Sequence, residues 1–155
     1  MIRVVGIGSP FGDDQVGWRV IEQLEGRLPP GVALSALDRP GSALIQSLQD
    51  TDWLILIDAL SCQGKAGQII RIDAEQAEAG SSKLSSHGLD LAQTLNLATA
   101  LGCRPRRVDI YGIVIDQIAS TGLDPAVAAA VPQLVRIVEQ SLWHRPTSTA
   151  GPNRA

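Results

Sequence analysis

The chain has 155 residues, of which 13 are basic and 16 are acidic, so its net charge is -3. Its Lys and Arg residues form no cluster that could follow a phosphate backbone, which excludes nucleic acid as an expected partner. A chain of this length fits one domain that buries roughly 70% of its unfolded surface, so neither disulfides nor a structural metal should be needed to hold it together.

The sequence also predicts a cytoplasmic protein without a membrane segment. No apolar run reaches membrane-spanning length, and the N-terminus lacks the basic lead, apolar region and cleavage site of a signal peptide. The two cysteines, Cys62 and Cys103, are too far apart for a zinc or redox motif and too few for a disulfide framework.

The first half of the chain alternates β-branched runs with amphipathic stretches, a pattern typical of layered α/β domains. Residues 2–7 and 32–37 predict two strands, each followed by a helix with one apolar face. Residues 53–57 form an unbroken apolar run, which is typical of a central strand covered on both faces.

The second half continues the alternation with one reversal of direction. Residues 68–72 predict a fourth strand, and the connection before it is too short for a crossover helix, so it should run antiparallel to its neighbour. A third helix should begin near His87, and residues 107–114 predict the last strand. Asp124 and Pro125 are a suitable N-cap and first-turn pair for a long final helix.

Residues 1–143 are therefore expected to form a single domain. Residues 144–155 are polar and rich in Pro, Ser and Thr, which predicts a disordered tail.

Four residues of the types that bind metals are expected at one edge of the sheet. If the first three strands run parallel, Asp14, Asp38 and Asp58 all emerge at the carboxyl edge, where α/β sheets bind ligands. Because the fourth strand runs toward the amino edge of the sheet, the chain must cross back to the carboxyl edge before the next helix. This places His87 at the same edge. Carboxylates with one imidazole suit nickel, zinc, manganese or iron, and three protein ligands leave a position open for water or substrate.

Each of these residues also has an ordinary structural explanation. Asp13 and Asp14 precede a helix, where acids cap the helix or complement its dipole. Asp38 could start a turn, and His87 could be a surface or capping residue. Asp58 is harder to explain in this way, because an acid at the end of a buried strand costs free energy unless it is paired or coordinated.

Other chemistries are weaker. The opening G-I-G-S-P-F-G lacks the dinucleotide-binding spacing, and the two acids at the following helix would repel a pyrophosphate. A serine hydrolase using Ser85 or Ser86 with His87 would lack the G-x-S-x-G elbow. Cys62 follows Asp58 closely, but nothing marks its thiol as activated.

Four motifs occur in an order that points to one family. They are G-I-G-S-P-F-G-D-D-Q-V-G at 6–17, L-D at 37–38, L-I-L-I-D-A-L at 54–60 and S-S-H-G-L-D-L-A at 85–92. Over residues 1–143 the chain resembles the hydrogenase maturation endopeptidases, which trim the C-terminus of nickel-iron hydrogenase large subunits. The resemblance implies a three-layer α/β/α sandwich with a mostly parallel five-stranded sheet that contains one antiparallel strand.

The resemblance also implies a site and a substrate. Asp14, Asp58 and His87 match the family's nickel-binding residues, and Asp38 matches a further acid implicated in function. Asp13 is the alternative first ligand, but the spacing of Asp14 to Gly17 favours Asp14. The expected substrate is a large-subunit precursor that already carries its nickel, and the protease would bind that same nickel ion. Other divalent ions could substitute for nickel. The protease is expected to act as a monomer. A non-hydrolytic accessory protein that binds nickel or the precursor is the alternative from a different functional class.

Overall fold

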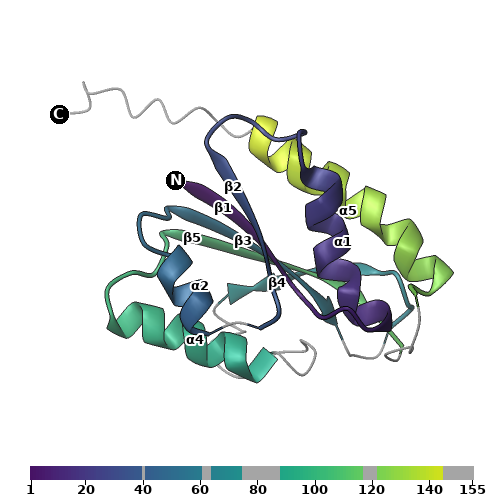
Figure 1. Cartoon of the computed structure of the whole chain (residues 1–155), viewed down its shortest axis with the longest axis horizontal. Helices are drawn as coiled ribbons and strands as arrows, with labels where there is room; N and C mark the ends of the chain where they lie inside the picture. Colours follow the sequence, from purple (N-terminus) through teal and green to yellow (C-terminus); the bar gives the residue numbers. More distant parts are fainter. Residues whose placement is uncertain (40, 61–63, 75–87, 117–121, 145–155) are drawn as a thin grey trace.

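A five-stranded sheet forms the centre of the molecule (Figure 1). The computed structural model describes residues 1–39, 41–60, 64–74, 88–116 and 122–144. The strands are β1 (Ile2–Ile7), β2 (Val32–Leu37), β3 (Trp53–Leu60), β4 (Ile69–Asp73) and β5 (Arg107–Val114). Their order in the sheet is β2-β1-β3-β5-β4, in which β4 alone runs antiparallel to its neighbour. The predicted strand count, central strand and single reversal are confirmed.

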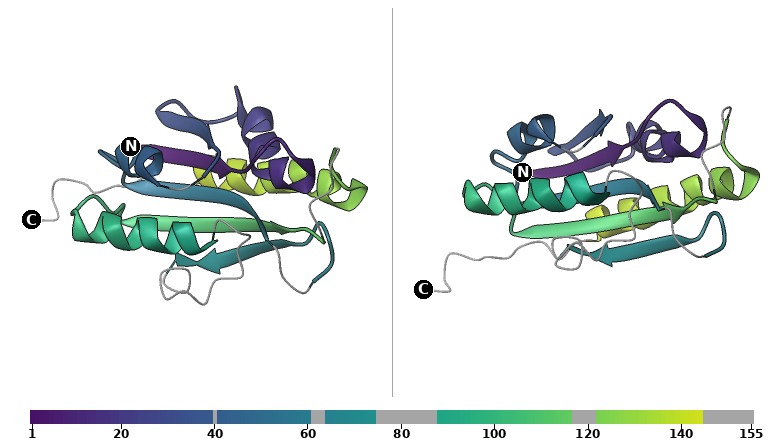
Figure 2. Two further views of the ribbon diagram at one scale, coloured as in Figure 1. Left: turned by 60° about the horizontal axis from the view of Figure 1, so that its bottom comes forward. Right: turned by 90° about the horizontal axis from the view of Figure 1, so that it is seen from below.

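Helices cover both faces of this sheet (Figures 1 and 2). Within the described ranges they are a short 3-10 helix, η1 (Gly12–Gln15), and the α-helices α1 (Val16–Leu24), α2 (Ser42–Ser47), α4 (Gly88–Ala100) and α5 (Pro125–Trp143). One core cluster joins α1 and α5 to the sheet, and a second joins α2 and α4 to the opposite face. The predicted three-layer α/β/α sandwich is thereby confirmed.

β3 shows why both faces need a helical layer. Ile55 and Ile57 belong to the core beneath α1 and α5, whereas Leu54 and Leu56 belong to the core beneath α2 and α4. All four side chains are completely buried. Because successive side chains of a strand point to opposite faces, this unbroken apolar run stabilises both layers at once, by roughly 1.5–3 kcal/mol for each side chain.

β3 is longer than the sequence pattern indicated. The strand was expected to end before Asp58, but it continues to Leu60, with Asp58 opposite Gly112 of β5. The pairing of β3 with β1 ends earlier, at Ile57. The extra residues remain in the sheet because β5 continues to Val114 and supplies their hydrogen-bonding partners. Asp58 therefore lies one residue past the end of the β1 pairing.

The final helix begins as predicted. The Asp124 side chain accepts a hydrogen bond from the Ala126 N–H at 2.9 Å, and Pro125 occupies the first helical position. The predicted disordered tail lies almost entirely beyond the described residues, which end at 144. Within the described ranges, no helix is both long enough and apolar enough to cross a membrane.

Candidate active site

Glycines bring the start of α1 against the ends of β1 and β3. A Cβ on Gly17 would lie 2.5 Å from the Ile7 carbonyl oxygen and 2.9 Å from the Ile57 carbonyl oxygen. A Cβ on Gly6 would lie 2.4 Å from the carbonyl oxygen of Gly17. The backbones approach so closely that no side chain fits between them. As a result η1, which precedes α1, contacts β3 and holds Asp14 near the carboxyl end of that strand.

Backbone hydrogen bonds fix the loop that carries Asp14. The Gly8 N–H donates to the Leu37 carbonyl at 3.0 Å, which joins this loop to the end of β2. The Ser9 N–H donates to the Asp14 carbonyl and the Asp14 N–H donates to the Phe11 carbonyl, each at 3.1 Å. The main chain of Asp14 is thus held through both its donor and its acceptor, and its carboxylate starts from a fixed position.

Asp14 and Asp58 are both buried acids at this edge. Their residues are 6% and 1% exposed, respectively. The Asp58 Oδ1 accepts a hydrogen bond from the Ala59 N–H at 2.7 Å. The Asp14 Oδ1 is buried and has no hydrogen-bond partner among the described residues. A buried carboxylate oxygen without a donor is costly, so this atom is a natural ligand for a cation.

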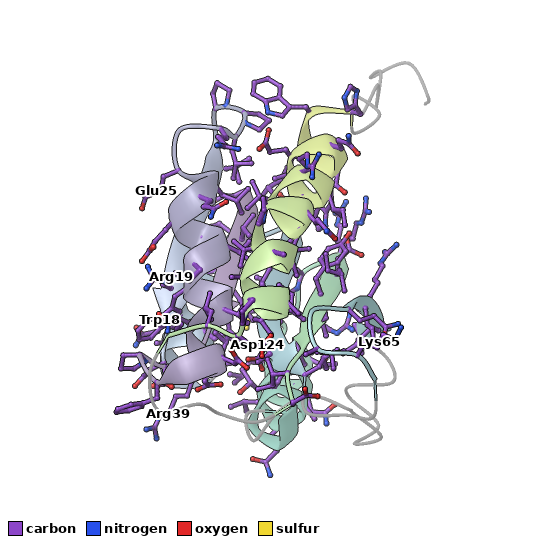
Figure 3. All side chains as sticks on the ribbon, turned by 90° about the vertical axis from the view of Figure 1, so that its right-hand side faces the viewer. Trp18, Arg19, Glu25, Arg39, Lys65 and Asp124 are labelled. Atoms are coloured by element: carbon purple, nitrogen blue, oxygen red, sulfur yellow. The ribbon has the colours of Figure 1, made fainter. Side chains whose placement is uncertain are left out.

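Asp13 has a different partner from its neighbour. It is 3% exposed, and its Oδ1 accepts a hydrogen bond from the Asp124 N–H at 2.7 Å. In Figure 3, Asp124 lies at the start of α5, beside the end of α1 that carries Trp18. Neither acid is the N-cap of α1, because Gln15 occupies that position. The Gln15 side chain makes no capping hydrogen bond. Asp13 instead ties the first loop to α5.

Asp38 lies at the same edge but outside the buried pair. It follows β2, and its side chain is 73% exposed. Its Oδ2 lies 3.9 Å from the Nε of Arg39, a surface contact that contributes less than about 1 kcal/mol. The predicted location at the carboxyl edge is observed, and its proposed role in the reaction stays a prediction.

His87 lies outside the described residues, as do Ser85, Ser86 and Cys62. The helix that follows it is described: α4 begins at Gly88 and ends at Ala100, and β5 then begins at Arg107, on the amino edge. A helix of 13 residues is about 20 Å long. Gly88 therefore lies toward the carboxyl edge of the sheet.

The donor set at this edge fits a divalent cation. Asp14 and Asp58 offer carboxylate oxygens, and one of those oxygens has no donor within the described part of the chain. The described residues contain no group of three potential metal-binding side chains. The third predicted ligand is His87, which belongs to the part of the chain that is not described.

A further buried acid, Asp109, lies near the start of β5, toward the other edge of the sheet. It accepts hydrogen bonds from the Trp53 Nε1 at 2.8 Å and the Arg107 Nε at 3.0 Å, and it pairs with Arg71. The Arg107 guanidinium also lies 4.0 Å from the centre of the Trp53 ring. Sequence reasoning did not single out this cluster, although an aspartate inside an apolar strand was a usable signal. Its donors fully account for its burial, so its role is structural.

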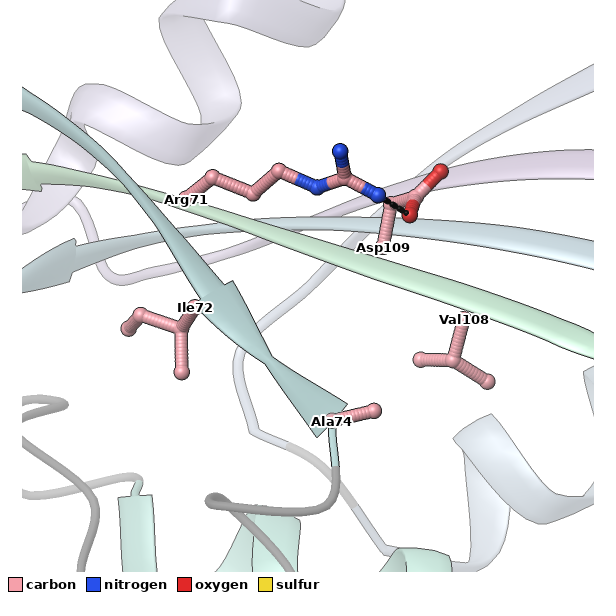
Figure 4. A pocket seen from close by; sticks show the side chains of 5 residues that line it. All are labelled: Arg71, Ile72, Ala74, Val108 and Asp109. Atoms are coloured by element: carbon pink, nitrogen blue, oxygen red, sulfur yellow. Dashed lines mark hydrogen bonds and ion pairs between the residues drawn. The ribbon is translucent and has the colours of Figure 1, made fainter.

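A hollow of about 380 Å³ adjoins this cluster. It is lined by Arg71, Ile72, Ala74, Val108 and Asp109 (Figure 4).

Comparison with known protein families and curated proteins gives a consistent result. The family model HycI, described as hydrogenase maturation protease, matches residues 18–141. The hydrogenase 2 maturation protease of Escherichia coli (strain K12) is 29% identical over 136 residues, which cover 84% of this chain and 83% of that protein. The hydrogenase expression/formation protein HoxM of Azotobacter vinelandii is 29% identical over 151 residues, which cover 93% of this chain and 73% of that protein.

Solved structures share the fold. The hydrogenase maturating endopeptidase HybD from E. coli superposes with a TM-score of 0.81 at 27% identity, covering 92% of each chain. A [NiFe] hydrogenase maturation protease, HycI, from Thermococcus kodakarensis KOD1 superposes with a TM-score of 0.75 over 92% of each chain, and its 20% identity supports the fold alone. With the family model matching most of its length, the chain belongs to the hydrogenase maturation protease family and is an endopeptidase.

Proposed function

We propose that this protein removes the C-terminal peptide of a [NiFe] hydrogenase large-subunit precursor once that precursor carries its nickel. Family membership makes the protein a hydrogenase maturation protease. The observation that supports dependence on nickel is the buried Asp14 Oδ1, which has no hydrogen-bond donor among the described residues. A positive ion brought by the substrate would compensate this oxygen.

In this proposal Asp14, Asp58 and His87 bind the nickel of the precursor. Asp14 and Asp58 add two buried carboxylates, whose negative charge attracts a divalent cation to this edge. Asp58 is held in place by the Ala59 N–H, and Asp14 by the hydrogen bonds of its main chain. His87 is included on the basis of its motif, and because Gly88, the next residue, lies toward the same edge. A bound nickel ion would polarise the scissile carbonyl or lower the pKa of a water molecule.

Asp38 is the proposed proton acceptor. It directly follows β2 and lies beside the loop of Asp14, because the Gly8 N–H donates a hydrogen bond to the carbonyl of the preceding residue, Leu37. Its carboxylate is exposed and only loosely paired with Arg39, so it can turn toward a water molecule at the scissile bond.

Mass spectrometry of the large subunit tests this function. The purified protein is incubated with nickel-loaded precursor and, in parallel, with nickel-free precursor. We expect the nickel-loaded subunit to lose the mass of its C-terminal peptide and the nickel-free subunit to remain intact. An unchanged mass in both samples would instead support a non-hydrolytic accessory protein, and cleavage of both would exclude dependence on nickel.

A further inference from the structure

A groove runs between α2 and α4 on the face of the sheet opposite α1 and α5. Its volume is about 600 Å³. From the α2 side it is lined by Arg39, Ser42, Ile45 and Gln46, and from α4 by Gln93 and Leu97.

On α4 the groove is lined by one apolar side chain outside the core, Leu97, and by the polar residues Gln93 and Thr94. Leu91, Leu95 and Ala98 are fully buried against the sheet, whereas Leu97 is 50% exposed and faces the groove. Across the groove, Ile45 of α2 is only partly buried against the core. Two branched aliphatic side chains, Ile45 and Leu97, thus line the groove, and removing their exposed surface from solvent would be favourable.

Amide side chains flank this apolar strip. Gln93 precedes Leu97 by about one helical turn, and Gln46 follows Ile45 on the opposite wall. A primary amide can both donate and accept hydrogen bonds, as the main chain of an extended peptide requires. The lining therefore suits a peptide segment that carries an apolar side chain.

The groove extends toward the carboxyl edge of the sheet, because Arg39 is one of its lining residues. Arg39 directly follows Asp38, which is the first residue after β2 at the carboxyl edge of the sheet. A polypeptide whose scissile bond lies near Asp14 and Asp58 can thus continue from that edge into the groove.

We propose that this groove binds the C-terminal extension of the hydrogenase large-subunit precursor, the segment that cleavage removes. The inference rests on the proposed function, because that function places the scissile bond at the carboxyl edge. A concave strip between two helices fits a chain end better than it fits the convex surface of a folded subunit. The extension anchors one apolar side chain between Ile45 and Leu97.

Two matched substitutions, one on α4 and one directly after it, test this inference. Leu97→Ser removes the groove residue, and Leu101→Ser changes a leucine that is 61% exposed, lies four residues farther along the chain and does not line the groove. Binding is measured with nickel-free precursor, which should stay intact, and with a large subunit truncated to its mature length. Thermal unfolding of both variants serves as the folding control.

We expect Leu97→Ser to weaken binding of the precursor about tenfold, as truncation of an anchoring side chain does, and Leu101→Ser to change it less than twofold. Neither variant should alter binding of the mature-length subunit. In cleavage of nickel-loaded precursor, Leu97→Ser should raise KM by a similar factor and leave kcat unchanged.

Equal effects of the two variants on precursor binding, or an equal loss with the mature-length subunit, would overturn the inference. Failure of the wild-type protein to cleave nickel-loaded precursor would refute the proposed function instead. Specific loss of precursor binding in Leu97→Ser would then still assign the groove to the extension.

Discussion

Asp13 and Asp14 are neighbours in the sequence, yet the structure gives their carboxylates opposite environments. Asp13 accepts a hydrogen bond from the Asp124 N–H and thereby joins the first loop to α5. Asp14 has an oxygen with no donor among the described residues. This contrast supports Asp14 over Asp13 as the proposed first-loop metal ligand, the choice that the spacing of Asp14 to Gly17 also favours.

The contrast predicts opposite changes in stability for two isosteric substitutions. Asp14→Asn removes a buried charge whose oxygen lacks a donor, so the free energy of unfolding should stay constant or rise by about 1 kcal/mol. Asp13→Asn weakens a charge-assisted hydrogen bond and should lower the free energy of unfolding by about 1.5–3 kcal/mol. Chemical denaturation of the metal-free protein gives both values, and a larger loss for Asp14→Asn than for Asp13→Asn would contradict this assignment.

Asp109 shows which residue roles the sequence could not predict. Its donors come from β3, β4 and β5 itself, so they become neighbours only once the order and register of those strands are known. The location of Asp14 and Asp58 could be predicted, because the last part of a parallel strand and the loop that follows such a strand reach the carboxyl edge whatever the register. The exposure of Asp38 depends on the packing of its loop and was also not predictable.

Substituting Asp109 should affect stability and leave the chemistry unchanged. Asp109→Asn weakens the pairing with Arg71 and Arg107, and because both arginines are more than half exposed the loss should be only about 1–3 kcal/mol. Glu22→Gln, which removes an exposed pair with Arg19, is the control and should cost less than about 1 kcal/mol. Below the unfolding temperature kcat should be unchanged for both variants, and a lower kcat in Asp109→Asn alone would imply a role in the reaction.

At the scale of elements, the contact between α1 and the sheet positions the site. Gly6 and Gly17 allow backbone to pack on backbone, so that η1 reaches β3. The sequence showed glycines in this region but not which of them lie at a close contact, because that depends on how α1 lies on the sheet. The length of β3 was missed for a related reason, since its last residues are held by pairing with β5.

Gly17→Ala tests this packing. Alanine favours a helix over glycine by about 1 kcal/mol, but its Cβ would lie 2.5 Å from the Ile7 carbonyl oxygen. We expect overpacking to dominate, with a net loss of about 1–3 kcal/mol and slower cleavage. Gly64→Ala is the matched control, since its Cβ would meet the flexible Gln68 side chain at 3.1 Å. Equal unfolding midpoints for the two variants would show that α1 can move away from the sheet without loss of stability.

At the scale of the whole molecule, the alternation of apolar runs with amphipathic stretches predicted the fold. Four strands and their helices follow the order that right-handed crossovers produce, and the short connection before β4 correctly indicated its reversal. The same topology brings Asp14, Asp38 and Asp58 to one edge, since Asp14 and Asp38 follow parallel strands and Asp58 lies in the last part of another. The groove between α2 and α4 was not predictable, because it depends on how two helices pack side by side.

The role of the buried acids is tested most directly by cleavage of nickel-loaded precursor with Asp58→Asn. The asparagine keeps the size of Asp58, and its oxygen can still accept the Ala59 N–H, but the negative charge is lost. We expect kcat/KM to fall at least about 100-fold while the melting temperature is maintained. Cleavage at the wild-type rate by a correctly folded Asp58→Asn variant would contradict the account.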